Sequence, residues 1–424
     1  MRLLDTRLVH REDLEADRAG ERCSFVRFRR LLHSYHRARA AGASDEDYVG
    51  LARRLDAAVA AVEGHGFDET PFARSDPLSE ALGFAEPGGV WLKDETGNVA
   101  GSHKARHLMG VALHLEVAEL VGLADPSARR TLAVASCGNA ALAAAVVAAA
   151  AGRHLQVFVP PDANPAILER LGALGADVVA CERRPGEHGD PPYLRLLDAL
   201  AAGALPFTCQ GNLNGLVIEG GETLGFEVAW ALGEAGLDAD HLVVQVGGGA
   251  LASACSQAFA EATELGVLAR RPALHTVQTI AAHPLERAYH KVWALLPRAG
   301  GGAAGGDGLL AGPGELEAAL HQAARHRSQF MWPWEHPPRS IATGILDDET
   351  YDWLAVVGGM LATGGRPVVV GEEGLLEANG LARKAGLDAD ATGTAGLAGL
   401  LELVAGGLVA RHERVVVLLT GARR

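Results

Sequence analysis

From about Val90 to the end of the chain, short runs of β-branched and aliphatic residues alternate with longer stretches rich in Ala and Leu. The short runs are bounded by Gly, Pro, Asn or Asp, and the longer stretches carry apolar residues at helical spacing. The pattern predicts strands at 90–92, 131–135, 155–160, 177–179, 242–246, 274–279, 366–370 and 415–419, and helices at 104–116, 140–152, 165–174, 250–264, 373–385 and 394–405. Such alternation predicts an α/β fold with parallel sheets covered by helices on both faces.

Three segments depart from this alternation. Residues 1–70 show helical spacing over 25–41 and 45–62 and no strand pattern, so they predict a helical N-terminal extension. The segment 298–314 is rich in glycine and has no periodicity, which predicts a mobile insertion. Residues 330–338 concentrate aromatic residues and prolines, and they form either a stiffened surface loop or a wall of a substrate pocket.

Charge and composition exclude several classes of protein. The 424 residues include 38 Lys+Arg and 52 Asp+Glu, a net charge of −14, which argues against binding to a nucleic-acid backbone. The densest basic run, residues 27–30, is typical of a solvated helix face. No apolar run approaches the roughly 18 residues of a membrane span, and an acid at Asp5 interrupts any export signal. The five cysteines form no CxxC pair, which favours a reducing cytoplasm.

Lysine is rare in this chain. The chain has 34 arginines but only four lysines: Lys93, Lys104, Lys291 and Lys384. Of these two residue types, only lysine has an amine that can lose its proton and condense with a carbonyl group, so each lysine is a candidate for chemistry. Lys104 falls in the first turn of a predicted helix, and Ser102 is the expected N-cap of that helix. The first turn lies at the positive end of the helix dipole, so an acidic residue would be more stable there than a lysine. Lys104 is therefore either a nucleophile or an ordinary surface lysine.

Further candidate chemistry lies where predicted strands lead into helices. The glycine run at 247–249 could bring backbone N–H groups to a phosphate, or could simply make a tight turn. Its spacing does not match the Gly-x-Gly-x-x-Gly of dinucleotide-binding proteins. Residues 136–139, Ser-Cys-Gly-Asn, could hold a carboxylate and a ring oxygen, or could cap a helix. The spacing of His321, His326 and His336 gives no support for a metal site, so none is expected.

Together these motifs resemble one family of enzymes. Gly-Ser-His-Lys at 101–104, Ser-Cys-Gly-Asn at 136–139, the glycine loop and the terminal Thr420-Gly421 occur in the order seen in the tryptophan synthase β, threonine synthase and threonine dehydratase superfamily. These are pyridoxal phosphate (PLP) enzymes of fold type II. Weaker matches occur at 70–72, 220–227, 340–342 and 390–395. The resemblance covers more than four fifths of the chain.

The resemblance implies a role for each matching residue. Lys104 would bind the PLP aldehyde covalently and move the proton at the substrate's α-carbon. Asn139 would bond the 3′-oxygen of the ring, and Thr420 would face the ring nitrogen and leave it unprotonated, which makes the ring a moderate electron sink. The cofactor phosphate would be held by Gly247, Gly248, Gly249, Ala250 and Leu251. The substrate would be bound by Ser102, His103, Arg106, Ser136, Cys137 and Gly138.

The resemblance also implies domains and a reaction. The expected division is a helical extension at 1–70, a large PLP domain built from 71–104 and 215–424, and a small α/β domain at 105–214, in a homodimer. Threonine synthases typically read Ser-Phe-Lys-Asp-Arg-Gly around the lysine, whereas this chain reads Ser-His-Lys-Ala-Arg-His. The missing Asp favours α,β-elimination on a small hydroxy (or β-substituted) amino acid, as in threonine or serine dehydratase. The alternatives are threonine synthase-like replacement on O-phosphohomoserine and a PLP-binding protein without catalysis.

Overall fold

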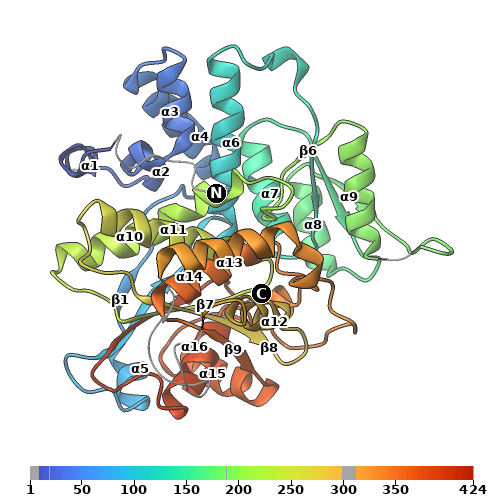
Figure 1. The fold of residues 1–424 in the computed structure, drawn as a ribbon. Coiled ribbons are helices and arrows are strands. Elements are labelled where there is room, and N and C mark those ends of the chain that lie inside the picture. Colours follow the sequence, from blue (N-terminus) through green and yellow to red (C-terminus); the bar gives the residue numbers. More distant parts are fainter. Residues whose placement is uncertain (1–8, 19, 188, 298–311, 424) are drawn as a thin grey trace. The chain divides into compact units, whose positions relative to one another are not determined.

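The computed structural model describes residues 9–18, 20–187, 189–297 and 312–423 (Figure 1). The chain divides into two compact units. The six-stranded unit contains Thr70–Thr96 and the chain from Gly225 onward, and the four-stranded unit contains Gly97–Leu224 and the described residues up to Glu69. The segment 97–104, which the sequence analysis assigns to the large domain, groups with the four-stranded unit, as does the N-terminal extension. Most of the glycine-rich segment 298–314 lies outside the described residues.

The sheet of the six-stranded unit has the order β1-β2-β10-β7-β8-β9. Its strands are β1 (Phe72–Arg74), β2 (Gly89–Asp94), β7 (His241–Gln245), β8 (Ala273–Thr279), β9 (Pro367–Val370) and β10 (Arg414–Leu419). All neighbouring strands are parallel except β1, which pairs with β2 in the antiparallel sense. The sequence pattern missed β1 because three residues are too few to show a strand period.

Helices cover both faces of this sheet. They are α5 (Asp76–Ala81), α11 (Ala250–Glu264), α12 (Pro284–Trp293), α13 (Pro313–Arg325), α14 (Trp353–Thr363), α15 (Glu372–Lys384) and α16 (Ala395–Ala405). Figure 1 shows α15 and α16 on one side of β7, β8 and β9 and α14 on the other. Alternate residues of the central strands, among them Val243, Val277 and Val417, are buried together with Leu397 and Leu400 of α16.

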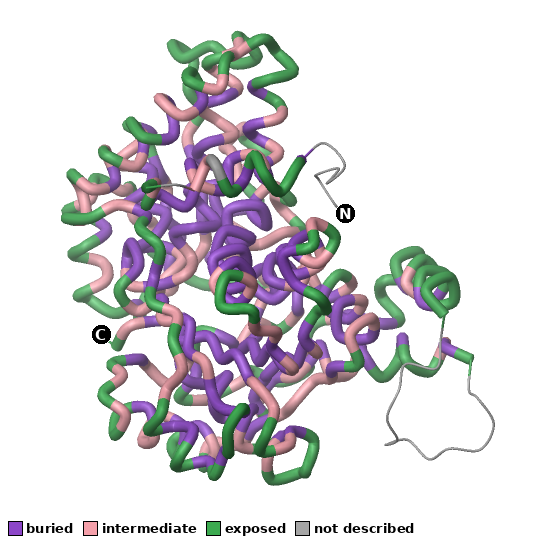
Figure 2. The backbone as a smooth tube through the Cα atoms, turned by 90° about the vertical axis from the view of Figure 1, so that its left-hand side faces the viewer, coloured by how far each residue is buried: buried purple, intermediate pink, exposed green. Residues whose placement is uncertain are grey.

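The sheet of the four-stranded unit is entirely parallel, in the order β5-β4-β3-β6. Its strands are β3 (Leu132–Ala135), β4 (Leu155–Val159), β5 (Asp177–Ala180) and β6 (Leu205–Pro206), and its helices are α1 (Arg11–Arg18), α2 (Ser24–Arg27), α3 (His33–Ala40), α4 (Asp45–Glu63), α6 (Lys104–Leu120), α7 (Asn139–Ala150), α8 (Pro165–Ala173) and α9 (Pro191–Ala201). Helix α10 (Val217–Glu234) begins in this unit and ends in the other. Buried residues gather in the strands and the adjacent helices (Figure 2), so the predicted α/β fold with helix-covered parallel sheets is confirmed.

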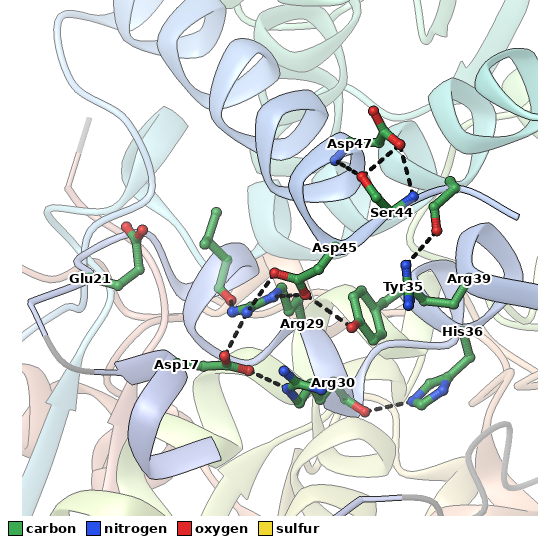
Figure 3. Close-up of polar contacts among 12 residues, drawn as sticks. Asp17, Glu21, Arg29, Arg30, Tyr35, His36, Arg39, Ser44, Asp45 and Asp47 are labelled. Atoms are coloured by element: carbon green, nitrogen blue, oxygen red, sulfur yellow. Dashed lines mark hydrogen bonds and ion pairs between the residues drawn. The ribbon is translucent and has the colours of Figure 1, made fainter. Parts of the chain in front are cut away.

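Ion pairs connect the helices of the N-terminal extension, and they involve basic residues that the sequence analysis placed in solvent. The predicted helix 25–41 is broken into α2, a short 3-10 turn and α3. Arg29, expected on a solvated face, is only 6% exposed. Its guanidinium donates to Asp45 Oδ1 at 2.8 Å and to Asp17 Oδ1 at 2.5 Å, and Asp17 also accepts from Arg30 (Figure 3). Interpreting the basic run as a solvated face is therefore wrong for Arg29, because it ties α1 to α4.

Two kinds of feature are absent from the described residues. None of their helices is both long enough and apolar enough to cross a membrane. Within the same residues, no group of three or more His, Cys, Asp or Glu side chains is arranged to hold a metal ion.

A buried pair of histidines lies at the start of β7 and β8. His241 Nδ1 is 3.1 Å from His275 Nε2, and His241 Nε2 is 3.0 Å from Glu413 Oε2. His275 is 3% exposed. Burial, followed by the charges of His241 and Arg366, lowers the pKa of His275 to about 3. The folded protein therefore keeps this ring neutral in mildly acidic solution.

We expect this ring to make the fold sensitive to acid. Below about pH 6.5 the unfolded chain takes up a proton on His275, whereas the folded chain does not until the pH approaches 3. Between these values stability falls as the pH falls, and this group contributes a loss of roughly 2 kcal/mol between pH 8 and pH 5. Denaturant unfolding of wild type and His275→Asn at pH 8 and pH 5 measures this change in the free energy of unfolding. The exposed-site variant His412→Asn should keep the wild-type dependence, and an equal dependence in His275→Asn would contradict the assignment.

Candidate active site

Two of the predicted motifs follow neighbouring parallel strands. The glycine loop at 247–249 follows β7, Thr420 follows β10, and these strands pair in the register Val243 to Val417. The carboxyl ends of both strands therefore lie at one edge of the six-stranded sheet, where ligands of parallel α/β sheets usually bind. The structure brings the predicted phosphate loop and Thr420 together within this unit.

The glycine loop is closely packed on its outer side. A Cβ on Gly247 would overlap Asp347 Oδ2, and one on Gly248 would lie 2.8 Å from the Tyr351 ring. Gly249 has φ +96°, which favours glycine. The N–H of Asp352 donates to Gly248 O at 2.9 Å, which ties the loop to the segment before α14. The loop can therefore hold only glycines without moving its neighbours.

The start of α11 suits an anion. Gly249 is its N-cap and makes no side-chain cap bond. Among the described residues, no hydrogen bond is recorded from the backbone N–H groups of residues 248–251. These groups and the positive end of the α11 dipole can bind a phosphate. The residues present thus fit the phosphate of the predicted cofactor.

Thr420 is almost fully buried and is contacted by a residue that the sequence analysis missed. Its side chain is 3% exposed, and its hydroxyl oxygen accepts a hydrogen bond of 2.6 Å from Gln245 Nε2. The same amide nitrogen is close to Gly393 O at 3.0 Å and Leu418 O at 3.2 Å. The signal that could have found Gln245 is a polar residue at the end of an otherwise apolar strand.

The structure distinguishes Lys93 from Lys104. Lys93 on β2 is 0% exposed, forms an ion pair with Glu227 and donates to Thr70 O at 2.7 Å. Lys104 is the first residue of α6 and is only partly buried. Within the described chain, its amine makes no hydrogen bond and no ion pair. The amine of Lys104 is therefore available for chemistry, while that of Lys93 is occupied by its partners.

The turn before Lys104 has an unusual backbone. Ala100 has φ +54° and ψ +25°, a left-handed conformation that costs a non-glycine residue energy, and its N–H donates to Glu63 Oε1 at 3.1 Å. The expectation that Ser102 caps α6 is wrong, because His103 is the N-cap residue and the Ser102 hydroxyl bonds none of the helix N–H groups. The hydroxyl of Ser102 is buried and has no partner among the described residues, so it remains available to a ligand.

Two buried groups around Lys104 are neutral. Burial, with smaller effects of Lys104 and Arg106, lowers the pKa of His107 to about 4. Its Nδ1 is 2.8 Å from Val217 O, and its ring meets that of His103 edge to face. Burial raises the pKa of Cys209 to about 11, and the thiol donates to Lys104 O at 3.8 Å. Neither residue therefore adds a charge beside the amine.

The carboxylate motif lies at the start of α7, directly after β3. Ser136 donates its N–H to Phe158 O at 3.1 Å, and its hydroxyl accepts from the N–H of Gly138 at 3.3 Å. Gly138 is the N-cap of α7, so Asn139 lies inside the helix and does not cap it with its side chain. Cys137 is exposed. This uncapped helix start is suited to a carboxylate.

Arg106 takes a different position from the one expected of a substrate-binding residue. It is 0% exposed, and its Nη1 donates to Thr223 Oγ1 on α10 at 3.2 Å. A Cβ on Gly220 of α10 would overlap Arg106 O, so α6 and the start of α10 approach closely. The side chain is thus part of the packing between these helices.

The aromatic segment 330–338 contacts helix α12. The Arg287 guanidinium lies over the Trp332 ring, 3.7 Å from its centroid, and donates to Glu335 Oε1 at 2.8 Å. His283 lies against Trp334, with ring centroids 4.4 Å apart. Trp332 and Trp334 are thus partly exposed beside charged side chains, whereas Phe330 is buried.

Comparison with known proteins identifies the family. The family model described as pyridoxal-phosphate dependent enzyme matches residues 65–421. Threonine synthase of Methanocaldococcus jannaschii is 25% identical over 359 residues, which cover 83% of this chain and 74% of the relative. Threonine synthase of Halalkalibacterium halodurans is 27% identical over 360 residues, 84% of this chain and 82% of the relative.

Solved structures show the same fold. The processed form of threonine deaminase isoform 2 from Solanum lycopersicum has a TM-score of 0.62 at 17% identity and covers 90% of this chain and 86% of that chain. Diaminopropionate ammonia lyase from Escherichia coli has a TM-score of 0.61 at 16% identity, with 88% of each chain covered. With the family match over residues 65–421, the chain belongs to the pyridoxal-phosphate-dependent enzymes of fold type II, and pyridoxal 5′-phosphate is its cofactor.

Proposed function

We propose that this enzyme eliminates the β-substituent of a small hydroxy amino acid, L-threonine or L-serine, to give a keto acid and ammonia. The observation that carries the proposal is the position of Arg106. The cation closest in sequence to Lys104 is fully buried and bonded to Thr223, and the position between them is Ala105, where threonine synthases have an acid. A phosphorylated substrate would need a cation at hand, whereas threonine and serine do not.

In this proposal the residues of the predicted site keep their roles, except Arg106, whose buried side chain does not bind the substrate. Bound PLP supplies an electron sink for the charge left on the α-carbon when its proton departs. Lys104 holds the cofactor and moves that proton. The substrate carboxylate is bound by Ser136, Cys137 and Gly138 at the start of α7, and Ser102 and His103 line the substrate's other side. Asn139 bonds the ring oxygen, Thr420 faces the ring nitrogen, and the phosphate rests on Gly247, Gly248, Gly249, Ala250 and Leu251.

A second candidate has support from the relatives. The threonine synthases named above are 25–27% identical to this chain over more than four fifths of its length. Replacement on O-phosphohomoserine is therefore the alternative reaction. We further propose that the enzyme is a cytoplasmic homodimer, as the family resemblance and the scattered cysteines suggest. Sedimentation of the purified enzyme tests the oligomeric state.

A substrate panel separates the two reactions. The purified enzyme with PLP is mixed with L-threonine, L-serine and O-phospho-L-homoserine, and keto acid, ammonia and inorganic phosphate are measured. We expect keto acid and ammonia in equal amounts from threonine or serine, and no phosphate from O-phospho-L-homoserine. Release of phosphate together with formation of threonine would establish the synthase and reject the dehydratase.

We expect Gly247→Ala to weaken PLP binding by about tenfold or more. The added methyl group would overlap Asp347 Oδ2, and overpacking of this kind costs about 1–3 kcal/mol, where 1.4 kcal/mol is tenfold in affinity. Fluorescence titration of the apoenzyme with PLP measures the change. Gly380→Ala on α15, where a Cβ meets nothing within 4 Å, is the matched control and should bind normally. Equal affinities for both variants would mean that the phosphate rests elsewhere.

A further inference from the structure

The loop after β6 lies beside the predicted carboxylate motif. Strands β3 and β6 are parallel neighbours, paired at Ala133 and Pro206, and the N–H of Phe207 donates to Ala133 O at 2.9 Å. Residues 208–210 therefore follow β6 at the same edge of the four-stranded sheet where residues 136–139 follow β3. Ligands of parallel α/β sheets usually bind at this carboxyl edge.

The same loop reaches the start of α6. The thiol of Cys209 donates to Lys104 O at 3.8 Å, and Cys209 is 8% exposed. Gln210 is the next residue, and its backbone O accepts from the N–H groups of Leu213 and Asn214 at 3.1 and 3.2 Å, so the chain turns directly after it. Gln210 thus belongs to a loop that borders both the helix of Lys104 and the motif at the start of α7.

The side-chain amide of Gln210 makes no hydrogen bond among the described residues, although its oxygen is buried. Nearly all buried polar groups of native proteins are hydrogen-bonded, and an exception calls for an explanation. Ser102, two residues before Lys104, carries a second such atom, because it is 0% exposed and its hydroxyl has no partner in the same part of the chain. Two unsatisfied polar groups beside the start of α6 indicate a place that a ligand completes.

The chemistry of the substrate leaves one group for this amide. In the proposed function the substrate carboxylate lies at the start of α7, and the amine faces the cofactor that Lys104 holds. The hydroxyl on the β-carbon is then the polar group that still needs a partner. A carboxamide offers both a donor and an acceptor, as a hydroxyl does, so the two groups can bond in either orientation of the amide.

We propose that Gln210 is a specificity-determining residue whose side-chain amide binds the β-hydroxyl of the substrate. The inference rests on the proposed function, in which the residues around Lys104 bind a small hydroxy amino acid. A site built to bond a hydroxyl group rejects the analogue that lacks it, because the amide of the site is then left unpaired. Gln210 thus distinguishes a hydroxy amino acid from an aliphatic one of similar size.

Two amino acids that have no α-proton to lose measure this contact without turnover. α-Methyl-L-serine and 2-aminoisobutyrate differ only in a hydroxyl group, and the visible band of the bound cofactor reports the binding of each to the holoenzyme. We expect wild type to bind α-methyl-L-serine about tenfold more tightly, the effect of a single hydrogen bond. In Gln210→Met the two dissociation constants should become equal. Gln210→Asn, whose amide is a methylene shorter, should also reduce the preference and serves if Gln210→Met does not fold.

Gln156→Met is the matched control. Gln156 lies near the amino end of β4 in the same sheet, and its amide already donates to Asp177 Oδ2 at 3.2 Å. This variant should keep the wild-type preference for α-methyl-L-serine. An equal loss of preference in Gln156→Met and Gln210→Met would overturn the proposal, since the loss of any glutamine from this sheet would then have the same effect.

The outcomes separate this inference from the function on which it rests. An undiminished preference in Gln210→Met refutes the role of Gln210 whatever reaction the substrate panel shows, and so does a wild type that binds both analogues equally. If the α-methyl group keeps both analogues out, L-serine and L-alanine are compared by rapid mixing before turnover, with the same expected preference. Phosphate release from O-phospho-L-homoserine, together with a preference that Gln210→Met abolishes, would reject the dehydratase and leave the contact of Gln210 intact.

Discussion

Lys104→Ala is expected to lose catalysis almost completely, by at least about 10²–10⁴-fold, the range for loss of a general acid–base. The amine at the start of α6 has no hydrogen-bond or ion-pair partner among the described residues, and we expect no other lysine of the chain to replace it. After borohydride reduction, mass spectrometry should find PLP attached to the wild-type peptide that contains Lys104, and to no peptide of the variant.

Two controls make this result specific. Lys384→Ala, at an exposed site on α15, should retain both activity and the attached cofactor. Added methylamine should restore part of the activity of Lys104→Ala, because a free amine can take over the proton transfer. Attachment of the cofactor to Lys93 in the wild type would refute the assignment of Lys104.

Lys93→Met is expected to lower the free energy of unfolding by about 3–5 kcal/mol, because it removes one partner of a buried ion pair. Lys93 and Glu227 are both 0% exposed in their side chains and form an ion pair with each other. Glu227 Oε2 also accepts from the N–H of Thr70 at 3.2 Å, which holds the start of the six-stranded unit against α10. Denaturant unfolding at saturating PLP measures the loss.

The double variant Lys93→Met/Glu227→Met should recover most of that stability, since replacing a whole buried ion pair by apolar residues is often neutral. In all three proteins PLP should still be attached to Lys104. A loss below about 1 kcal/mol in Lys93→Met would contradict the structural weight given to this ion pair.

The pattern of the chain predicted several of the long, buried elements, although it missed α10 and α14. The helix predicted at 250–264 matches α11, and the strand predicted at 415–419 lies within β10. These elements are recognisable because the apolar residues of a long strand or helix repeat at the spacing typical of that element. The pattern failed for β1 and for the break at Phe28, because such short elements depend on contacts with distant parts of the chain.

The sequence by itself determined the α/β fold, the family and the cofactor, because order and spacing of motifs survive in a linear chain. It could not tell a buried residue from an exposed one. The pattern suggested that Arg29 and Arg106 were available cations, but both are buried, Arg29 bonded to Asp17 of another helix and Arg106 to Thr223, 117 positions away. The choice between Lys93 and Lys104, and the bond from Gln245 to Thr420, were decided by the tertiary structure. The physical reason is that partners and burial arise between different helices and strands, so the pattern within one element does not contain them.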